Sequence, residues 1–150
     1  MTKEIELKTK TCCFYGGEIY KSKKSDVSCK LKKQIEKLIN SGITIFNVGA
    51  DRNFDLMAAV HIIRLKNVYP SIRLNLIVPS LSKMNESENG FLQNFIFFNA
   101  DTLSVVSGMY DENCKHEAEK RLSKNAGYCV VYSTAVDSIR EKGMTIIDIS

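Results

Sequence analysis

Short apolar runs rich in β-branched residues alternate with amphipathic segments along the whole chain, and no other feature restricts the fold as strongly. Six runs have the length and composition of buried strands: residues 10–14, 43–48, 73–78, 102–106, 128–132 and 145–149. Helical patterns occupy the segments between them: residues 31–39, 54–66, 91–99, 115–124 and 134–142. Near-continuous apolar strands separated by helices are typical of a parallel sheet covered on both faces. The alternation therefore predicts a doubly wound α/β fold with a mainly parallel sheet of about six strands.

The segment at residues 31–39 illustrates the helical pattern. Its apolar side chains recur at i, i+4, i+7 and i+8, so they share one face of a helix. Gly42 is expected to end this helix, because glycine readily adopts the left-handed conformation of a C-terminal cap. The 150 residues contain no linker-like stretch and no internal repeat, so we expect one domain over residues 1–150.

Composition excludes several classes of protein. With 44% hydrophobic residues, 8 glycines and 2 prolines, the chain can bury a core and is neither collagen-like nor of low complexity. No apolar run approaches the roughly 20 residues of a membrane span, and the first ten residues lack the apolar stretch of a signal peptide. The five cysteines form no Cys-x-x-Cys pair. We therefore expect a cytoplasmic protein with reduced thiols, and we expect Cys114, in a loop, to be the exposed one.

The net charge of +4 is concentrated near the N-terminus. Residues 1–40 hold ten lysines against five acidic residues, whereas the rest of the chain holds 11 basic and 12 acidic residues. Such a cluster attracts phosphates of nucleic acids or of small ligands, although the solvated face of a lysine-rich helix has the same composition. No aromatic residues are interleaved with the lysines as a single-strand binding surface requires. Nucleic acid is therefore not the expected partner.

Glycines follow two of the predicted strands at their carboxyl ends. Gly16 and Gly17 follow the first strand, and Gly49 follows the second, shortly before Arg52. Ligands of parallel sheets bind beyond the carboxyl ends of the strands, and glycine lets backbone N–H groups approach a ligand closely. A helix beginning near Phe54 adds N-terminal donors that suit phosphate. Together the loops predict one cleft for an anionic nucleotide, although either loop alone fits a simple turn equally well.

Several blocks resemble one family in order along the chain. The block Thr11-Cys12-Cys13-Phe14-Tyr15-Gly16 resembles the opening of YpsA-like proteins of the SLOG (SMF/DprA–LOG) superfamily, whose first strand typically ends Cys-Cys-Phe-Thr-Gly-His-Arg-Pro. Residues 48–56 are similar to that family's Gly-x-x-x-Gly-x-Asp-x segment. Residues 65–79 fit its third strand and the proline after it. The resemblance implies a Rossmann-like domain that binds nucleotides or nucleotide-derived ligands at its strand ends.

The chain keeps part of the family pattern and departs from the rest. Gly16, Gly49 and Asp55 match, whereas Gly17-Glu18 replaces the family's His-Arg pair. Arg52 is our own candidate for the cation that this replacement removes.

The largest departure lies near the C-terminus. Only Thr134 remains of the family's Gly-Gly-Thr loop, and Asp137 is displaced from the position of the catalytic glutamate in LOG-type enzymes. We therefore expect no catalytic residue.

The expected ligand site has three kinds of contact: glycine backbone and Arg52 for phosphate, tyrosines that stack on the base or sugar, and Asp55 for the loop or a ribose hydroxyl. The expected contacts are Tyr15, Gly16, Gly17, Gly49, Ala50, Asp51, Arg52, Asn53, Asp55, Tyr110 and Thr134. No cofactor and no metal are expected. His61 and His116 lack the ligand spacing of a zinc site, and His61 is expected to pack or hydrogen-bond in the core.

Three functions are compatible with these features. The favoured one is non-catalytic binding of a nucleotide-derived small molecule by a sensor or a sponge. Resemblance to the ligand-sensing modules of anti-phage systems extends this hypothesis to sequestration of a cyclic-nucleotide-type immune signal. The alternatives are a LOG-type nucleoside monophosphate phosphoribohydrolase and a DprA-like protein that binds single-stranded DNA through its lysines.

The predicted helix at residues 91–99 carries more aromatic surface than one side of a sheet needs. Phe91, Phe95 and Phe98 share its apolar face, and Phe97 lies off that face, where it is expected to reach an interface or a base. We therefore expect a homo-oligomer, with a two-fold dimer as the simplest form.

Overall fold

A computed structural model describes residues 3–50, 52–80, 90–108, 111–133 and 143–150 of the chain. The strands are β1 (Thr11–Gly16), β2 (Ile45–Gly49), β3 (Arg73–Ser80), β4 (Thr102–Ser107), β5 (Tyr128–Tyr132) and β6 (Thr145–Asp148). The helices are α1 (Lys3–Lys8), α2 (Lys24–Asn40), α3 (Asn53–Leu65), α5 (Gly90–Asn99) and α6 (Glu112–Ser123), with a 3-10 turn η1 (Lys21–Lys23) before α2.

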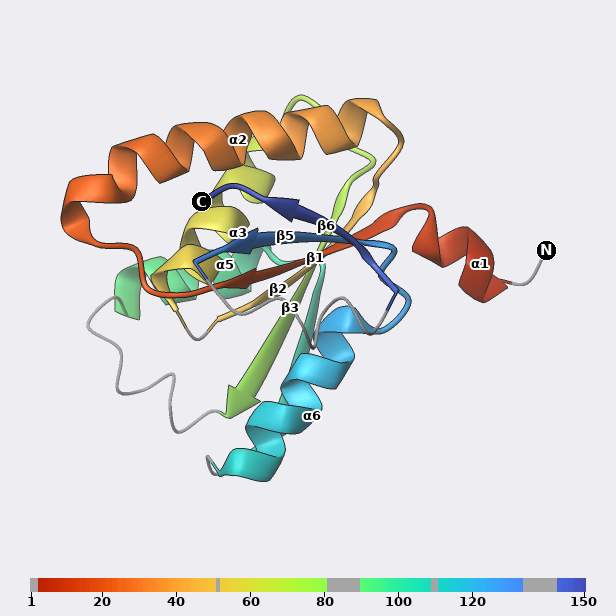
Figure 1. Ribbon diagram of the computed structural model, residues 1–150. Coiled ribbons are helices and arrows are strands. Elements are labelled where there is room, and N and C mark those ends of the chain that lie inside the picture. The colour runs from red at the N-terminus through yellow and green to blue at the C-terminus, as the bar shows by residue number, and fades with distance from the viewer. Residues whose placement is uncertain (1–2, 51, 81–89, 109–110, 134–142) are drawn as a thin grey trace.

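The six strands form one parallel sheet in the order β4-β3-β2-β1-β5-β6 (Figure 1). The order reverses beside β1, which pairs with β2 on one side and with β5 on the other. This arrangement is the doubly wound, Rossmann-like α/β fold that the alternating pattern predicts, so that prediction is confirmed. The carboxyl ends of β1 and β2 are neighbours at one edge of the sheet.

Helices α2, α3 and α5 cover one face of the sheet, which we call the thick face (Figure 1). α2 buries Val27, Leu31, Ile35 and Leu38, which recur at helical spacing as the sequence pattern predicts. Gly42 has a φ of 109°, the left-handed conformation that stops α2 after Asn40. The strands contribute large side chains to the same core, including Phe14 and Phe46, whose ring centroids are 6.1 Å apart.

Helix α6 covers the opposite face, which we call the thin face (Figure 1). Its buried side chains Ala118 and Leu122 pack on Ile77 of β3, and a second small cluster surrounds Cys13 and Cys129. α6 begins at Glu112, three residues before the predicted start, because the Asp111 side chain accepts a hydrogen bond from the Cys114 backbone N–H at 2.7 Å and caps the helix.

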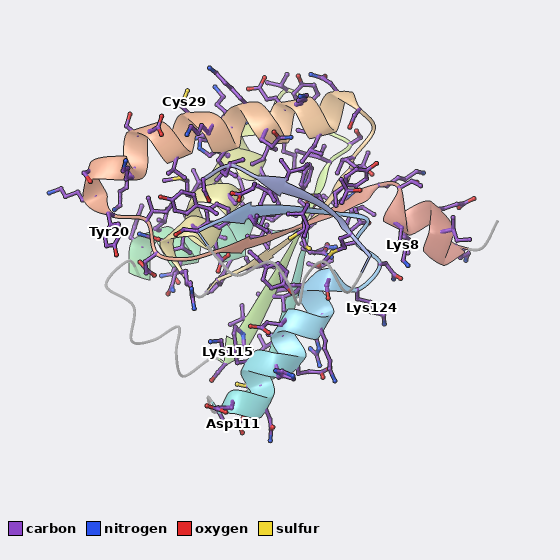
Figure 2. The ribbon with its side chains drawn as sticks, in the orientation of Figure 1. Lys8, Tyr20, Cys29, Asp111, Lys115 and Lys124 are labelled. Atoms are coloured by element: carbon purple, nitrogen blue, oxygen red, sulfur yellow. The ribbon has the colours of Figure 1, made fainter. Side chains whose placement is uncertain are left out.

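Two local expectations are wrong, and one short helix was missed. Cys114 lies in the first turn of α6 and is buried, whereas Cys29 on α2 is the exposed thiol (Figure 2). Phe97, expected to reach an interface or a base, packs against the core, whereas Phe91, Phe95 and Phe98 on the apolar face are exposed. The short helix α1 was not predicted, because its six residues lack a clear apolar face.

Two features are absent from the described residues. No helix among them has the length and apolar character to cross a membrane. In the same part of the chain, no three His, Cys, Asp or Glu side chains gather closely enough to hold a metal ion. His61 is half-buried on α3, and its Nε2 lies 2.9 Å from Ser28 Oγ on α2, so the expected hydrogen-bonded role is confirmed.

Candidate functional site

The ends of β1, β2 and β3 open into one pocket beneath α6. Its wall includes both predicted glycine turns, through Gly16 and Gly49. The residues that line it are Phe14, Tyr15, Gly16, Gly49, Ala50, Arg52, Asp55, Ile77, Pro79, Lys115, Ala118, Glu119 and Leu122. The prediction that the two glycine turns share one cleft is therefore confirmed.

Close packing against the first turn of α3 explains both glycines. A Cβ at Gly16 would lie 2.2 Å from Cδ1 of the buried Phe54 ring, which is shorter than any normal contact. A Cβ at Gly49 would lie 3.1 Å from Oδ2 of Asp55. The glycines thus let α3 start directly against the strand ends, and this start is what brings Arg52 to the pocket.

The start of α3 is held by Asp55. Its Oδ2 accepts a hydrogen bond from the Arg52 backbone N–H at 3.2 Å, and the carboxylate is buried. Carboxylates are favourable in the first turn of a helix because they meet unpaired N–H groups and the positive end of the helix dipole. Asp55 therefore holds the loop, one of the two roles expected for it.

Arg52 connects the two glycine turns. Its Nη1 lies 3.5 Å from the Gly16 carbonyl oxygen, at the long limit of a hydrogen bond, and the side chain is exposed. It forms no ion pair with any described residue. A guanidinium held this loosely at the mouth of a pocket is able to turn toward an anion.

Asn53 and Gly17, two of the expected ligand contacts, are hydrogen-bonded within the protein. The Asn53 side chain accepts from the Ile19 N–H at 2.8 Å and donates to the Ile19 carbonyl at 2.9 Å, so it clamps the segment after β1. Gly17 donates its N–H to the Tyr132 carbonyl at 2.9 Å. Neither residue lines the pocket. Asp51, Tyr110, Thr134 and the displaced Asp137 lie outside the described residues.

Tyr15 lines the pocket while its hydroxyl is occupied. The hydroxyl donates to the Glu119 carbonyl oxygen at 2.7 Å, so the ring stands between β1 and α6. Burial is the largest cause of a raised pKa for this phenol, and the neighbouring Cys13 thiol adds to it. Tyr15 is thus a neutral anchor for α6 whose ring edge forms part of the wall.

Helix α6 supplies a wall that the sequence argument did not include. Lys115 and Glu119, both half-buried, stand beside the buried Ala118 and Leu122 along the pocket. Figure 2 shows Lys115 on α6 beside the end of β3. The spacing i, i+3, i+4, i+7 from residue 115 to residue 122 puts these side chains on one helix face, and this signal was present in the sequence.

The pocket wall holds two cationic side chains, Arg52 and Lys115, and two carboxylates, Asp55 and Glu119, which differ in their partners. Asp55 is buried and turned to the Arg52 N–H, whereas Lys115 and Arg52 form no ion pair with a described residue. Glu119 is the remaining carboxylate of the wall. With a cavity volume of about 110 Å³, the pocket is smaller than the 300–1,000 Å³ typical of sites that enclose a whole drug-sized ligand. It has room for a charged fragment of a ligand.

Comparison with known proteins adds no family: no protein-family model matches the chain, and no curated protein matches it. The chain is therefore classified by its Rossmann-like fold, six parallel strands alternating with helices.

Proposed function

We propose that this protein binds a nucleotide-derived small molecule at the pocket beneath α6 and releases it unchanged, as a sensor or a sponge. One observation carries the proposal: the two glycine turns and the start of α3 converge on a pocket that also receives Arg52 and Lys115. Cations that form no ion pair with a described residue, at the carboxyl edge of a parallel sheet, suit a phosphate group.

The backbone adds to this preference for an anion. The N–H groups of Asn53 and Phe54, in the first turn of α3, form no hydrogen bond among the described residues. Unpaired donors at a helix start carry partial positive charge and attract phosphate. The limited volume suits a phosphate-bearing fragment, so the base of the nucleotide would extend beyond the described wall.

Non-catalytic binding is favoured because Asp55, the described carboxylate beside the glycine turns, is buried and has a structural role. It accepts the Arg52 N–H and so holds the start of α3. A phosphoribohydrolase is the second candidate, and the observation in its favour is that Glu119 lines the same pocket.

The test combines a ligand panel with matched variants. Purified protein is incubated with nucleoside monophosphates, dinucleotides and cyclic dinucleotides, and both the melting temperature and the integrity of each ligand are measured. For a ligand that raises the melting temperature, Arg52→Ala is expected to weaken binding by roughly 1.5–3 kcal/mol, a factor of about ten to a hundred in Kd. Lys115→Ala should weaken it as well, whereas Lys120→Ala, on the outer side of α6, should leave it unchanged.

The outcomes separate the candidate functions. An intact ligand supports the binder, whereas a hydrolysed ligand whose turnover is lost in Glu119→Gln supports the enzyme. Salt-sensitive binding of oligonucleotides without any nucleotide effect supports the DNA-binding alternative. Unchanged affinity in both Arg52→Ala and Lys115→Ala would show that the ligand lies elsewhere.

The exposed face of α5 supports a second part of the proposal, a homodimer. Phe91 and Phe98 are each 90% exposed and Phe95 is 41% exposed, at i, i+4 and i+7. No residue of α5 is charged, so two copies meet across a two-fold axis without like-charge repulsion. At about 200 Å² per phenylalanine the stripe covers roughly 450 Å² per copy, near the lower limit for a specific dimer. Light scattering should show dissociation on dilution, and a Phe91→Ser/Phe98→Ser variant should remain monomeric.

A further inference from the structure

A groove runs over the outer side of α3, on the opposite face of the sheet from the pocket beneath α6. Lys24 and Ser28, in the first turns of α2, line one side of the groove, and Leu92 of α5 lines the other. α3 contributes Asn53, Leu56, Met57, Val60, His61 and Arg64. With a cavity volume of about 310 Å³, it has the size of a small-molecule site.

The floor of the groove is apolar and firmly supported. Met57, Val60 and Leu92 are half-buried and pack directly against the main hydrophobic core. Such a floor favours the flat or aliphatic body of an organic molecule, because covering it removes apolar surface from water. Water and simple inorganic ions gain nothing from it.

The described polar groups of the groove are all neutral or cationic. Lys24 and Arg64 stand at its rim, exposed and without an ion pair among the described residues, and none of the described carboxylates lines it. Ser28 Oγ and His61 Nε2 lie 2.9 Å apart within it. Two cations, a hydroxyl and an imidazole around an apolar floor are complementary to a ligand with one anionic group and an apolar body.

We propose that this groove binds a small organic anion, a carboxylate or phosphate monoester with an apolar body, whose charged group meets Arg64, Lys24 and His61. The site is separate from the pocket beneath α6, because no described residue lines both. The body of the ligand would lie on Met57, Val60 and Leu92.

The imidazole gives this proposal a built-in reporter. In the free protein, burial and then the positive charges of Arg64 and Lys32 lower the pKa of His61. An anion beside the ring favours the imidazolium, so bound ligand should raise this pKa. His116, on α6, is the other histidine of the chain and serves as an internal control.

The experiment follows both histidines by NMR while phenyl phosphate is titrated, with inorganic phosphate and phenol as probes that keep only one half of the ligand. Phenyl phosphate is expected to shift the His61 ring resonances and to raise the midpoint of their pH titration, while His116 stays in place. Inorganic phosphate and phenol should each bind at least tenfold more weakly than phenyl phosphate. A His61→Gln variant assigns the resonances.

Variants separate this site from the first one. Arg64→Ala should weaken phenyl phosphate binding, read from the His61 resonances, by about ten- to hundredfold, the loss of one charged hydrogen bond, whereas Arg52→Ala should leave the binding seen at His61 unchanged. The proposal is overturned if millimolar phenyl phosphate leaves His61 unchanged, if the shift of His61 disappears in Arg52→Ala, or if Arg64→Ala binds like the wild type at His61. None of these results bears on nucleotide binding beneath α6.

Discussion

The two faces of the sheet are built differently. On the thick face, three helices and the strands bury one continuous core that includes Phe14, Phe46 and Phe54. On the thin face, α6 and the strands bury two small clusters among the described residues, and the pocket opens between α6 and the strand ends. The thick face therefore supplies most of the buried core, whereas packing on the thin face leaves empty volume beneath α6. The groove over α3 lies outside the core, on the outer side of the helices that cover the thick face.

The largest expected effect tests this division directly. Phe46→Ala removes a fully buried ring from the thick face and should lower the free energy of unfolding by about 3–5 kcal/mol. Leu122→Ala removes a side chain from the three-residue cluster of the thin face. Because this side chain has fewer buried neighbours, its loss should lower the free energy of unfolding by only about 2 kcal/mol. Urea unfolding measures both. Equal losses would contradict a division of labour between the faces.

A substitution at Gly16 probes the point where the two faces meet. The new Cβ of Gly16→Ala would collide with the Phe54 ring, which is stacked on Tyr132 with centroids 5.9 Å apart. We expect a loss of about 1–3 kcal/mol in unfolding free energy. The matched control is Gly90→Ala, where nothing lies within 4 Å of the new Cβ, and it should stay within about 0.5 kcal/mol of the wild type. If Gly16→Ala instead kept full stability and lost only ligand binding, contact with the ligand rather than packing would explain this glycine.

The smallest effect is a pH dependence confined to the thick face. Because burial first and then Arg64 and Lys32 lower the pKa of His61, the folded protein takes up a proton less readily there than the unfolded chain does. Stability is therefore unaffected above the ordinary histidine pKa of about 6.5 and falls as the pH drops below it. Unfolding at pH 7.5 and pH 5.5 should show a steeper loss for the wild type than for His61→Gln. If the wild type and His61→Gln lost the same free energy of unfolding between the two pH values, His61 would not be the cause.

Much of the fold was predictable from periodicity. Alternating strands and helices, the stop at Gly42 and the neighbouring glycine turns all follow from local patterns, since burial repeats every second residue in a strand and every 3.6 in a helix. Part of the candidate site followed as well, because parallel strands bring their carboxyl ends to one edge of the sheet. Of the residues that line the pocket, Tyr15, Gly16, Gly49, Ala50 and Arg52 were expected from their place at the strand ends, and Asp55 from the family resemblance.

The remaining features depended on which surfaces meet in three dimensions. Periodicity shows that Lys115 and Glu119 share a helix face with Leu122, but only the tertiary structure shows that this face closes the pocket. In the same way, only the tertiary structure shows that the Asn53 side chain is hydrogen-bonded to Ile19. The two residues are 34 positions apart, so no local sequence pattern indicates this pair. The sequence by itself determined the six strands, their order in the chain and the glycines at the strand ends. Only the tertiary structure decided which side chains are partners. These contacts depend on the free energy of packing between distant segments, and local sequence patterns do not encode that free energy.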